Sequence, residues 1–206
     1  PTYDDNGGII QPDSDHTENG QFCFVTGNAV SNNDNEFGYD DVDGGKTTLF
    51  SPVFDLSDHG EALVSYWRWY TNDVGDNPDT DYWKVDVSSD GGMTWSNLEN
   101  TNESQDQWIQ KQYLLSNFVE FSDAMKFRFV AEDLLNSGDS GSGGSIIEAA
   151  VDDFNISIFD DEDSQLQGDI NGDGGLNVLD VVALVNFVLS SNCSDSADIN
   201  LDGVCN

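Results

Sequence analysis

The sequence predicts a mainly β protein: a β-sandwich of the jelly-roll type with a small α-helical, EF-hand-like segment at its C-terminal end. Two observations lead to this prediction. Short runs of β-branched and aromatic residues recur between turns rich in glycine and aspartate. Apolar residues show no helical spacing before residue 176. Several short strands separated by such turns are typical of sandwiches and jelly rolls.

The strand at residues 62–70 is the clearest, because it is dense in aromatic and β-branched residues. The run at 47–54 is broken by Pro52, which indicates an edge or a strand end. The strands that we expect lie at residues 21–26, 47–54, 62–70, 82–88, 108–115, 126–132 and 146–159. Helical spacing follows at residues 178–189. The chain therefore divides into a sandwich domain at 1–160, an acidic linker at 161–167 and a small module at 168–206.

Acidic residues dominate the charge. The chain has 40 acidic and 6 basic residues and a formal net charge of −34. Such a chain repels nucleic acid and acidic lipid, so we expect neither as a partner. It favours bound cations or a saline setting, which offset the self-repulsion. A hydrophobic content of 37% still argues for a packed core, and no apolar run reaches the roughly 18–20 residues of a membrane span.

A calcium-binding loop is predicted at residues 169–180. Oxygen-bearing side chains fall at loop positions 1, 3, 5, 9 and 12, and Gly174 falls at position 6, where the chain must turn sharply. Calcium takes about six to eight oxygen ligands, which this spacing brings inward. A second segment, 198–206, repeats positions 1, 3, 5, 6 and 9 of the first, 29 residues further on.

Two such repeats, the first closing on Asp rather than Glu, resemble a type I dockerin. The resemblance implies two calcium ions. The ligands of the first would be Asp169, Asn171, Asp173, Asn177, Asp180 and the Gly175 carbonyl. Those of the second would be Asp198, Asn200, Asp202, Asn206 and the Val204 carbonyl, with no twelfth position in this sequence. The recognition pair at loop positions 10 and 11 is Val178-Leu179 instead of a polar pair, which argues against a cohesin partner.

The β region resembles the jelly-roll accessory domains related to MAM and cleaved-adhesin domains of secreted bacterial proteins. The residues that carry this resemblance are 43–45, 48–56, 65–70, 88–95 and 150–154. It implies a structural calcium between an early loop and the last strand. That site would take Asp41, Asp43, Asp153 and Glu148. Acidic residues beside a core strand would be costly to bury without a cation.

Two more acidic segments stand out. The loop at 72–81 holds acids at Asp73, Asp76 and Asp81, which could bind another calcium or only water. Residues 88–95 match the pattern S-x-D-x-G-x-T-W and are similar to the Asp-box hairpin, in which the Asp bonds backbone amides across the turn. The Asp-box has a structural meaning and does not by itself indicate an enzyme.

Strand alternation predicts a surface that carries basic and aromatic side chains. Phe127 and Phe129 point inward, so Lys126 and Arg128 point outward. Aromatic planes stack on sugars and Arg binds carboxylates, which suggests a shallow carbohydrate or peptide site. A ladder of cross-strand ion pairs is the alternative. The candidate ligand-binding residues are Tyr66, Arg68, Tyr70, Tyr82, Lys84 and Arg128.

Catalytic and redox motifs are sparse. His16 and His59 lie in polar loops without a zinc or serine-hydrolase pattern. Cys193 and Cys205 flank the last acidic loop and could form a disulfide, which would fit an extracellular setting, whereas Cys23 lies in an apolar run and is expected to be a buried thiol.

The predicted function is therefore that of a non-catalytic, calcium-binding accessory module. We expect it in a larger secreted bacterial protein, such as a peptidase or another hydrolase, with carbohydrate, protein or a cell surface as partner. One alternative is a structural or adhesive surface protein that self-assembles. Another is a carboxylate-based glycosidase.

Overall fold

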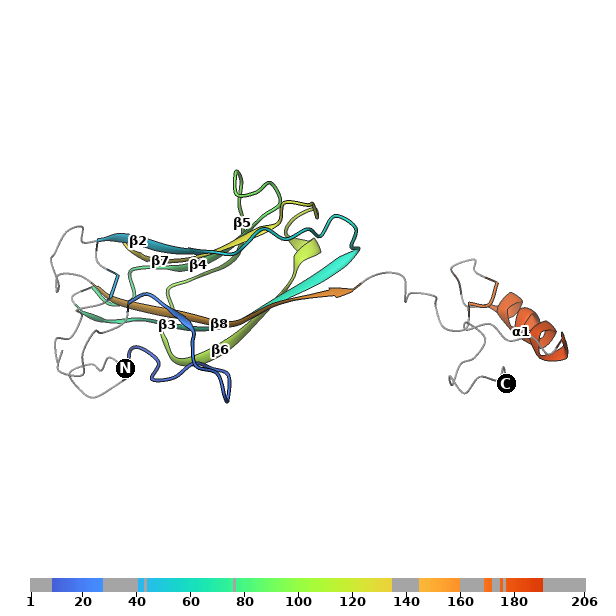
Figure 1. The fold of residues 1–206 in the computed structure, drawn as a ribbon, viewed down its shortest axis with the longest axis horizontal. Coiled ribbons are helices and arrows are strands. Elements are labelled where there is room, and N and C mark those ends of the chain that lie inside the picture. The colour runs from blue at the N-terminus through green and yellow to red at the C-terminus, as the bar shows by residue number, and fades with distance from the viewer. Residues whose placement is uncertain are drawn as a thin grey trace. The chain divides into compact units, whose positions relative to one another are not determined.

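The computed structural model describes residues 9–27, 41–42, 44–75, 77–134, 145–159, 169–171, 175 and 177–190. The chain forms two compact units, Pro1–Phe159 and Asp160–Asn206. The first contains two layers of strands and the second contains a helix (Figure 1).

The first unit is a β-sandwich, as predicted. Its described strands are β1 Phe24–Val25, β2 Gly45–Phe50, β3 Glu61–Gly75, β4 Trp83–Ser88, β5 Ser96–Thr101, β6 Gln105–Leu114, β7 Lys126–Asp133 and β8 Ser145–Phe159. They pair antiparallel in two four-stranded sheets, one in the order β1-β8-β3-β6 and the other in the order β2-β7-β4-β5. Among these strands only the β4–β5 hairpin stays within one sheet, and every other connection crosses between the layers.

The structure differs from the sequence prediction in two strands and at Cys23. β5 has no predicted counterpart, because its sequence Ser-Asn-Leu-Glu-Asn-Thr is polar and pairs only as an edge strand. β3 continues to Gly75 and pairs with β8, so the acidic loop expected at 72–81 begins later. Cys23 is half-buried, with a free thiol. Burial, followed by the nearby Asp152 and Asp15 charges, raises the pKa of that thiol.

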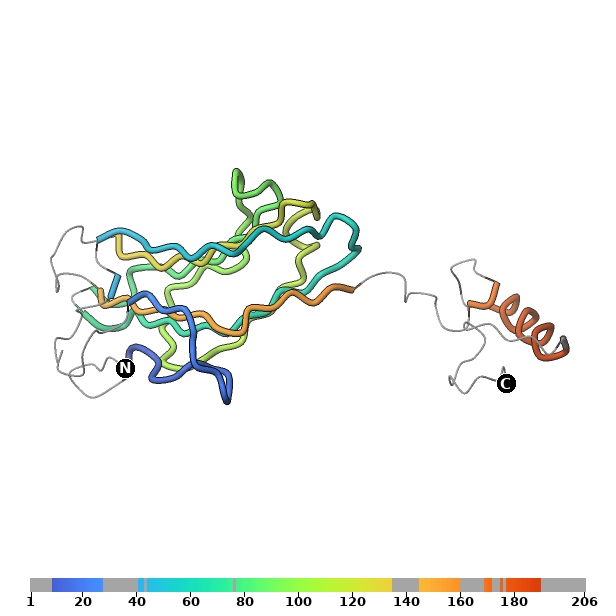
Figure 2. The backbone as a smooth tube through the Cα atoms, in the orientation of Figure 1, coloured from blue at the N-terminus to red at the C-terminus, as the bar shows by residue number. Residues whose placement is uncertain are grey.

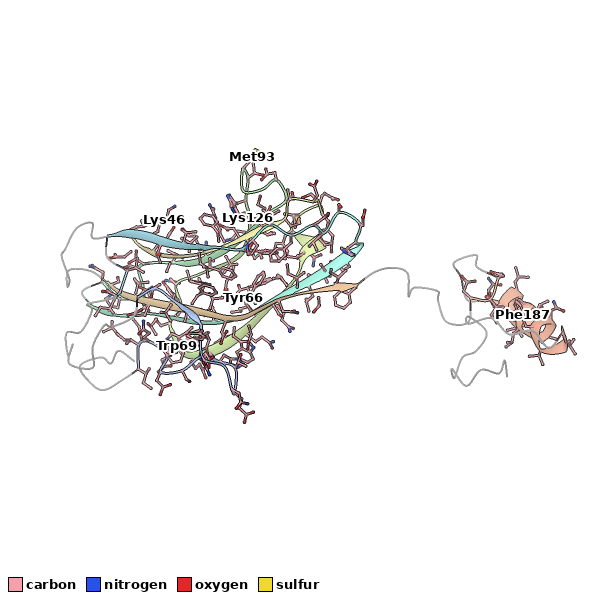
Figure 3. The ribbon with its side chains drawn as sticks, in the orientation of Figure 1. Lys46, Tyr66, Trp69, Met93, Lys126 and Phe187 are labelled. Carbon is pink, nitrogen blue, oxygen red and sulfur yellow. The ribbon has the colours of Figure 1, made fainter. Side chains whose placement is uncertain are left out.

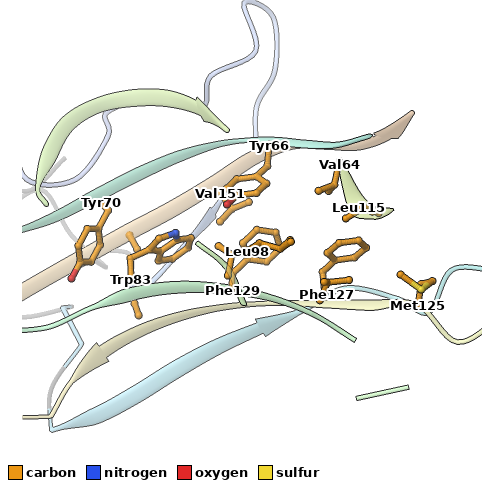
Figure 4. Close-up of a cluster of buried hydrophobic side chains, with 14 of the residues drawn as sticks. Val64, Tyr66, Tyr70, Trp83, Leu98, Leu115, Met125, Phe127, Phe129 and Val151 are labelled. Atoms are coloured by element: carbon orange, nitrogen blue, oxygen red, sulfur yellow. The ribbon is translucent and has the colours of Figure 1, made fainter. Parts of the chain in front are cut away.

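The core lies between the sheets (Figure 4). Strand alternation builds it, because side chains two apart on one strand face the same layer. On β7 these are Phe127 and Phe129, and on β4 they are Val85 and Val87. Aromatic contacts cross the gap: the rings of Tyr66 and Phe129 meet edge to face at 5.1 Å. Such contacts between facing sheets fix how the two layers register.

The second unit contains helix α1, Val178–Ser190, where the sequence predicts it. Asn177 caps it, since the Asn177 Oδ1 accepts the N–H of Leu179 at 2.8 Å. In the described part of the chain, no helix is long and apolar enough to cross a membrane.

Candidate functional site

Basic side chains gather on the outer face of the β2-β7-β4-β5 sheet. Phe127 and Phe129 of β7 fill the core, so Lys126 and Arg128 project outward, as predicted. Register places Lys46 of β2 opposite Glu132 of β7 and Lys84 of β4 opposite Val130 on the same face. Figure 3 labels Lys46 and Lys126 on this side of the sheet. Four of the chain's six basic residues therefore share one face.

Two of these four cations are paired with acids on the same face. Arg128 Nε donates to Asp86 Oδ2 at 2.7 Å, and Lys84 Nζ donates to Glu132 Oε2 at 2.6 Å. No carboxylate within ion-pair distance of Lys46 or Lys126 is found among the described residues. The predicted cross-strand ion pairs are thus present for two of the cations only.

Aromatic rings lie beside three of the cations. The Arg128 guanidinium lies 4.4 Å from the ring centre of Trp95, Lys126 Nζ lies 4.9 Å from that of Phe50, and Lys84 Nζ lies 5.8 Å from that of Tyr82. Phe50 and Tyr82 are 50% and 41% exposed. Cation–π contacts hold long basic side chains close to the sheet. We call this surface the basic aromatic face. Its residues are Lys46, Phe50, Tyr82, Lys84, Asp86, Trp95, Lys126, Arg128 and Glu132.

The Asp-box turn delivers Trp95 to this face. Asp90 accepts the backbone N–H groups of Met93 and Thr94 and the Thr94 hydroxyl. Gly91 and Gly92 have φ of 72° and 101°, which side chains other than glycine rarely adopt. The Thr94 side chain and backbone hold the pKa of Asp90 well below its usual range.

Asp90→Ala is expected to lower the melting temperature and to change the fluorescence of Trp95. In the wild type, the depressed pKa of Asp90 means that its contribution is present above the unfolded pKa of about 4 and is lost as the pH falls through the folded pKa. Asp90→Asn should therefore flatten the acid limb of the stability curve, measured by thermal melts from neutral to acidic pH. The exposed Asp58→Asn is the matched control, and an acid limb that is equal in Asp90→Asn and the wild type would contradict the assignment.

The sequence prediction is wrong for Tyr66, Arg68 and Tyr70. These three do share a face of β3, but it is the inner one: Tyr66 and Tyr70 are fully buried and Arg68 is 2% exposed. Figures 3 and 4 show Tyr66 between the two layers. They cannot contact a ligand on the outer surface.

Their burial has a physical reason, a carboxylate inside the sandwich. Glu99 of β5 is 6% exposed and accepts the Tyr66 hydroxyl at 2.7 Å, the Arg68 Nε at 2.8 Å and the Trp83 Nε1 at 3.1 Å. Lys111 Nζ of β6 lies 3.3 Å from Glu99 Oε1. A buried charge is tolerated when it is paired and hydrogen-bonded. We call these five residues the Glu99 network.

Burial, followed by the charge of Glu99, raises the pKa of Tyr66 well above its ordinary value and that of Tyr113 to about 12. Tyr66 therefore keeps its proton at neutral pH and acts as a donor to Glu99.

The opposite outer face, that of the β1-β8-β3-β6 sheet, carries tryptophans. Trp67 and Trp69 lie on β3 and Trp108 on β6. An N-terminal segment, residues 9–22, runs along this face and is drawn in blue in Figure 2; we call it the strap. The Trp69 Nε1 and the Thr71 hydroxyl both donate to the Ile10 carbonyl, at 3.0 and 2.7 Å. Sequence reasoning missed these tryptophans because it turned the wrong face of β3 outward.

The acids expected to hold a structural calcium lie apart. Glu148 pairs opposite Thr71 and Asp152 pairs opposite Trp67, so they are separated by about 13 Å along the strand. Glu148 is buried and accepts Gln11 Nε2 at 3.0 Å and the Thr26 hydroxyl at 2.6 Å. Asp153, with φ of 49°, accepts from His16 and Thr17 on the outer face.

One ion therefore cannot take both Glu148 and Asp153 as ligands. Asp41 precedes Val42, whose N–H donates to the Ile147 carbonyl beside Glu148, whereas Asp43 lies outside the described residues. Within the described ranges no group of three or more His, Cys, Asp or Glu side chains has a geometry that could hold a metal ion.

The other acidic loop is tied into the fold. Asp81 is 2% exposed and accepts the Leu134 N–H at 2.8 Å and the Ser145 hydroxyl at 3.0 Å. Asp73 is exposed on β3, and Asp76 lies outside the described residues. Asp81 thus joins the ends of β4, β7 and β8.

The described ends of the predicted C-terminal calcium loop lie together. Asp180 Oδ1 accepts the N–H of Ile170 at 3.0 Å and that of Asn171 at 3.3 Å, and Asp180 Oδ2 accepts the N–H of Asn177 at 2.8 Å. Its pKa is lowered, mainly by the backbone N–H of Asn177. The Gly175 carbonyl accepts Asn177 Nδ2 at 3.0 Å. Asp169 is also described.

The remaining predicted ligands and the predicted disulfide lie outside the described residues. These are Asp173, Asp198, Asn200, Asp202, Val204 and Asn206, with Cys193 and Cys205.

Comparison with known proteins gives distant likenesses only. No protein-family model matches this chain, and no curated protein matches it. Among solved structures it is similar to a Family 16 Carbohydrate Binding Module-2, with 12% identity and a TM-score of 0.33 over 56% of this chain and 72% of the other. It is similar to TmCBM61, solved with β-1,4-galactotriose, with 12% identity and a TM-score of 0.36 over 75% and 93%. A third is the EclA C-terminal domain, a sugar-binding protein, with 11% identity and a TM-score of 0.32 over 57% and 70%.

Proposed function

We propose that this chain is a non-catalytic carbohydrate-binding module and that its basic aromatic face contacts the ligand. The observation that carries this proposal is the gathering of four of six basic side chains with three aromatic rings on one sheet face. Exposed aromatic planes offer stacking surfaces to sugar rings, and the surrounding polar groups fix their orientation. A sheet face also presents these groups on a rigid scaffold.

The charge of this face favours glycans that carry carboxylates. Arg128 uses its Nε for Asp86, which leaves the two terminal nitrogens of its guanidinium for a ligand carboxylate. Lys46 and Lys126, without an ion-pair partner in the described structure, can neutralise further ligand charges. The net charge of −34 opposes the approach of an anionic polymer. At about 0.15 M salt, screening limits that repulsion to about 8 Å, so the local cations decide the contact.

Arg128→Ala should weaken binding to polygalacturonate oligomers about tenfold to a hundredfold. The reason is the loss of a charge-assisted hydrogen bond, which contributes about 1.5–3 kcal/mol. Isothermal titration calorimetry in 0.15 M salt measures the change. Arg128→Lys, which keeps the charge and loses the planar fork, should fall between the two.

Two controls accompany this experiment. Glu120→Gln changes an exposed charge away from the face and should leave affinity unchanged. Thermal melts establish that Arg128→Ala remains folded. Equal affinity of folded Arg128→Ala and the wild type for every anionic glycan tested would overturn the proposed role of the basic aromatic face.

The biological setting belongs to the same proposal. The module serves a larger secreted protein whose catalytic activity lies in another domain, and it positions that domain on a polysaccharide. The C-terminal loop binds calcium through its oxygen ligands, and the ion orders helix α1. The spacing of the loop oxygens supports this, as does the closure of its described ends through Asp180.

A further inference from the structure

We propose a second sugar-binding site on the opposite sheet, at Trp67, Asp152 and Asp153, which His16 of the strap fills from within the same chain. The site is distinct from the basic aromatic face, because it lies on the outer side of the other layer. Its ligand class is a neutral hexopyranose glycan. The inference does not depend on whether the basic aromatic face binds carbohydrate.

The first observation is the stacking of His16. Its ring lies 3.6 Å from that of Trp67, centre to centre, with an angle of 16° between the planes. The edge of Trp108 closes one side at 6.1 Å. A flat ring is therefore held on an indole face, in the place where a sugar ring would stack.

The second observation is the position of two carboxylates at the rim of that ring. Asp152 Oδ2 accepts the backbone N–H of His16 at 2.8 Å, Asp153 Oδ2 contacts the His16 Nδ1 at 2.8 Å, and Asp153 Oδ1 accepts the Thr17 hydroxyl at 2.5 Å. Two consecutive carboxylates reach one face because β8 has a bulge here. Trp67 pairs with Asp152 and Ser65 pairs with Asn155, so one extra residue stands in β8.

The indole of Trp67 and the carboxylates of Asp152 and Asp153 match the chemistry of a neutral pyranose. A pyranose ring has a flat C–H face and hydroxyl donors at its edge, which match an indole plane with charged acceptors beside it. An anionic sugar would meet Asp152 and Asp153 and be repelled. The second site, at Trp67, Asp152 and Asp153, therefore selects neutral sugars, whereas the basic aromatic face selects anionic ones.

His16 can move away from Trp67 while the strap stays attached to the sheet through its buried residues. Ile10 and Gln11 are 3% and 5% exposed and are held by Trp69, Thr71 and Glu148. The His16 side chain is 27% exposed, and that of Asp153 is 38% exposed. Segments with more solvent exposure open at lower free energy than buried ones. Displacement of His16 thus needs only the outer part of the strap to move.

Gly20 offers a way to loosen the strap without touching the site. A Cβ at Gly20 would lie 2.0 Å from Asp15 Oδ2 and 3.0 Å from the Thr17 Cβ. That Asp15 oxygen accepts the Phe22 N–H, so a methyl group at Gly20 would push the Asp15 carboxylate away and break a hydrogen bond that closes this turn of the strap. Gly20→Ala should therefore displace the strap and leave Trp67, Asp152 and Asp153 intact.

The test compares His16→Ala, Gly20→Ala and Trp67→Ala in the full chain. The probes are neutral hexaoses of glucose, mannose and galactose, measured by calorimetry. A strap that leaves the site open in about a tenth of molecules weakens binding about tenfold, so His16→Ala and Gly20→Ala should each bind one of these hexaoses about tenfold more tightly than the wild type. Trp67→Ala in either background should abolish the gain.

Two results would overturn the inference. One is that neither strap variant gains affinity for any hexaose, although tryptophan fluorescence shows that the strap has moved. The other is a gain that survives Trp67→Ala. Polygalacturonate binding by the same variants tests the basic aromatic face separately. If only the measurements with neutral hexaoses fail, the second site is overturned and the proposed function is not affected.

Discussion

Glu99→Ala is expected to destabilise the sandwich by about 3–5 kcal/mol, the cost of removing one partner of a buried ion pair. The substitution leaves Arg68, at 2% exposure, without its carboxylate inside the core. It also removes the acceptor of the Tyr66 hydroxyl and of the Trp83 indole N–H. Lys111 is 28% exposed and can turn to solvent, so it adds little.

Chemical denaturation followed by tryptophan fluorescence measures this loss. The exposed Glu103→Gln removes a nearby glutamate charge on the loop after β5 and should change stability by no more than about 0.5 kcal/mol. The double variant Glu99→Leu with Arg68→Met replaces the buried pair by apolar side chains and should recover the part of the loss that comes from the unpaired Arg68 charge, while the Tyr66 hydroxyl and the Trp83 N–H still lack their acceptor. If Glu99→Ala unfolds at the same denaturant concentration as the wild type, the Glu99 network does not hold the two sheets together.

The residues of the basic aromatic face show what alternation can predict. In the first half of β7, the apolar Phe127 and Phe129 alternate with the basic Lys126 and Arg128, so the sequence indicates both the alternation and which side is buried. The outward positions of Lys126 and Arg128 follow from that contrast. Lys84 on β4 follows for the same reason, because Val85 and Val87 fill the core.

On β3 the same reasoning identifies the two faces but cannot tell which is buried. Both carry aromatic residues, with Tyr66 and Tyr70 on one and Trp67 and Trp69 on the other. Groups distant in sequence decide which face of β3 is buried. Glu99 inside the sandwich gives Arg68 a partner, and the strap outside gives the Trp69 indole an acceptor. No local pattern contains that information.

β-Bulges explain why Glu99 and Asp153 do not lie where strand alternation would place them. Strict alternation of side chains between two faces does not allow for an extra residue in one strand. In β5, Val85 pairs with Glu99 and Asp86 pairs with Asn97, and the residue between, Leu98, is buried along with Glu99. In β8 the extra residue brings Asp153 to the same face as Asp152. At two of the register shifts in the described strands, a carboxylate is thus brought to an indole ring: Glu99 to Trp83, and Asp152 and Asp153 to Trp67.

Helix α1 of the C-terminal unit is rich in residues that disfavour a helix. Helix α1 contains five valines, Val178, Val181, Val182, Val185 and Val188, whose branched side chains lower helix propensity. Helices of about 12–15 residues are marginal in water without other support. All five valines are at least 49% exposed, so burial of these side chains contributes little to the helix. If the loop binds calcium as proposed, we expect the ion, the loop and the Asn177 cap to contribute to the stability of this helix.

Asp180→Ala is expected to abolish most of the helical circular-dichroism signal at 222 nm and to leave the sandwich folded. The substitution removes the acceptor of three backbone N–H groups, those of Ile170, Asn171 and Asn177, and one ligand of the proposed calcium. Adding EGTA to the wild type should have the same effect, and calcium should restore the signal in the wild type but not in the variant. All five tryptophans lie in the first unit, so their fluorescence reports the sandwich alone.

The pH dependence gives a second measure of the same group. The pKa of Asp180 is lowered in the folded chain, so its contribution is present above the unfolded pKa of about 4 and is lost as the pH falls through the folded pKa. The helical signal of the wild type should decline on that acid limb before the tryptophan signal does. Asp106→Asn, an exposed aspartate on β6, controls for the loss of one negative charge. A helical signal that is indifferent both to EGTA and to Asp180→Ala would rule out calcium as the ligand that orders helix α1, because a helix that keeps its signal without ion and without cap must be stabilised by packing instead.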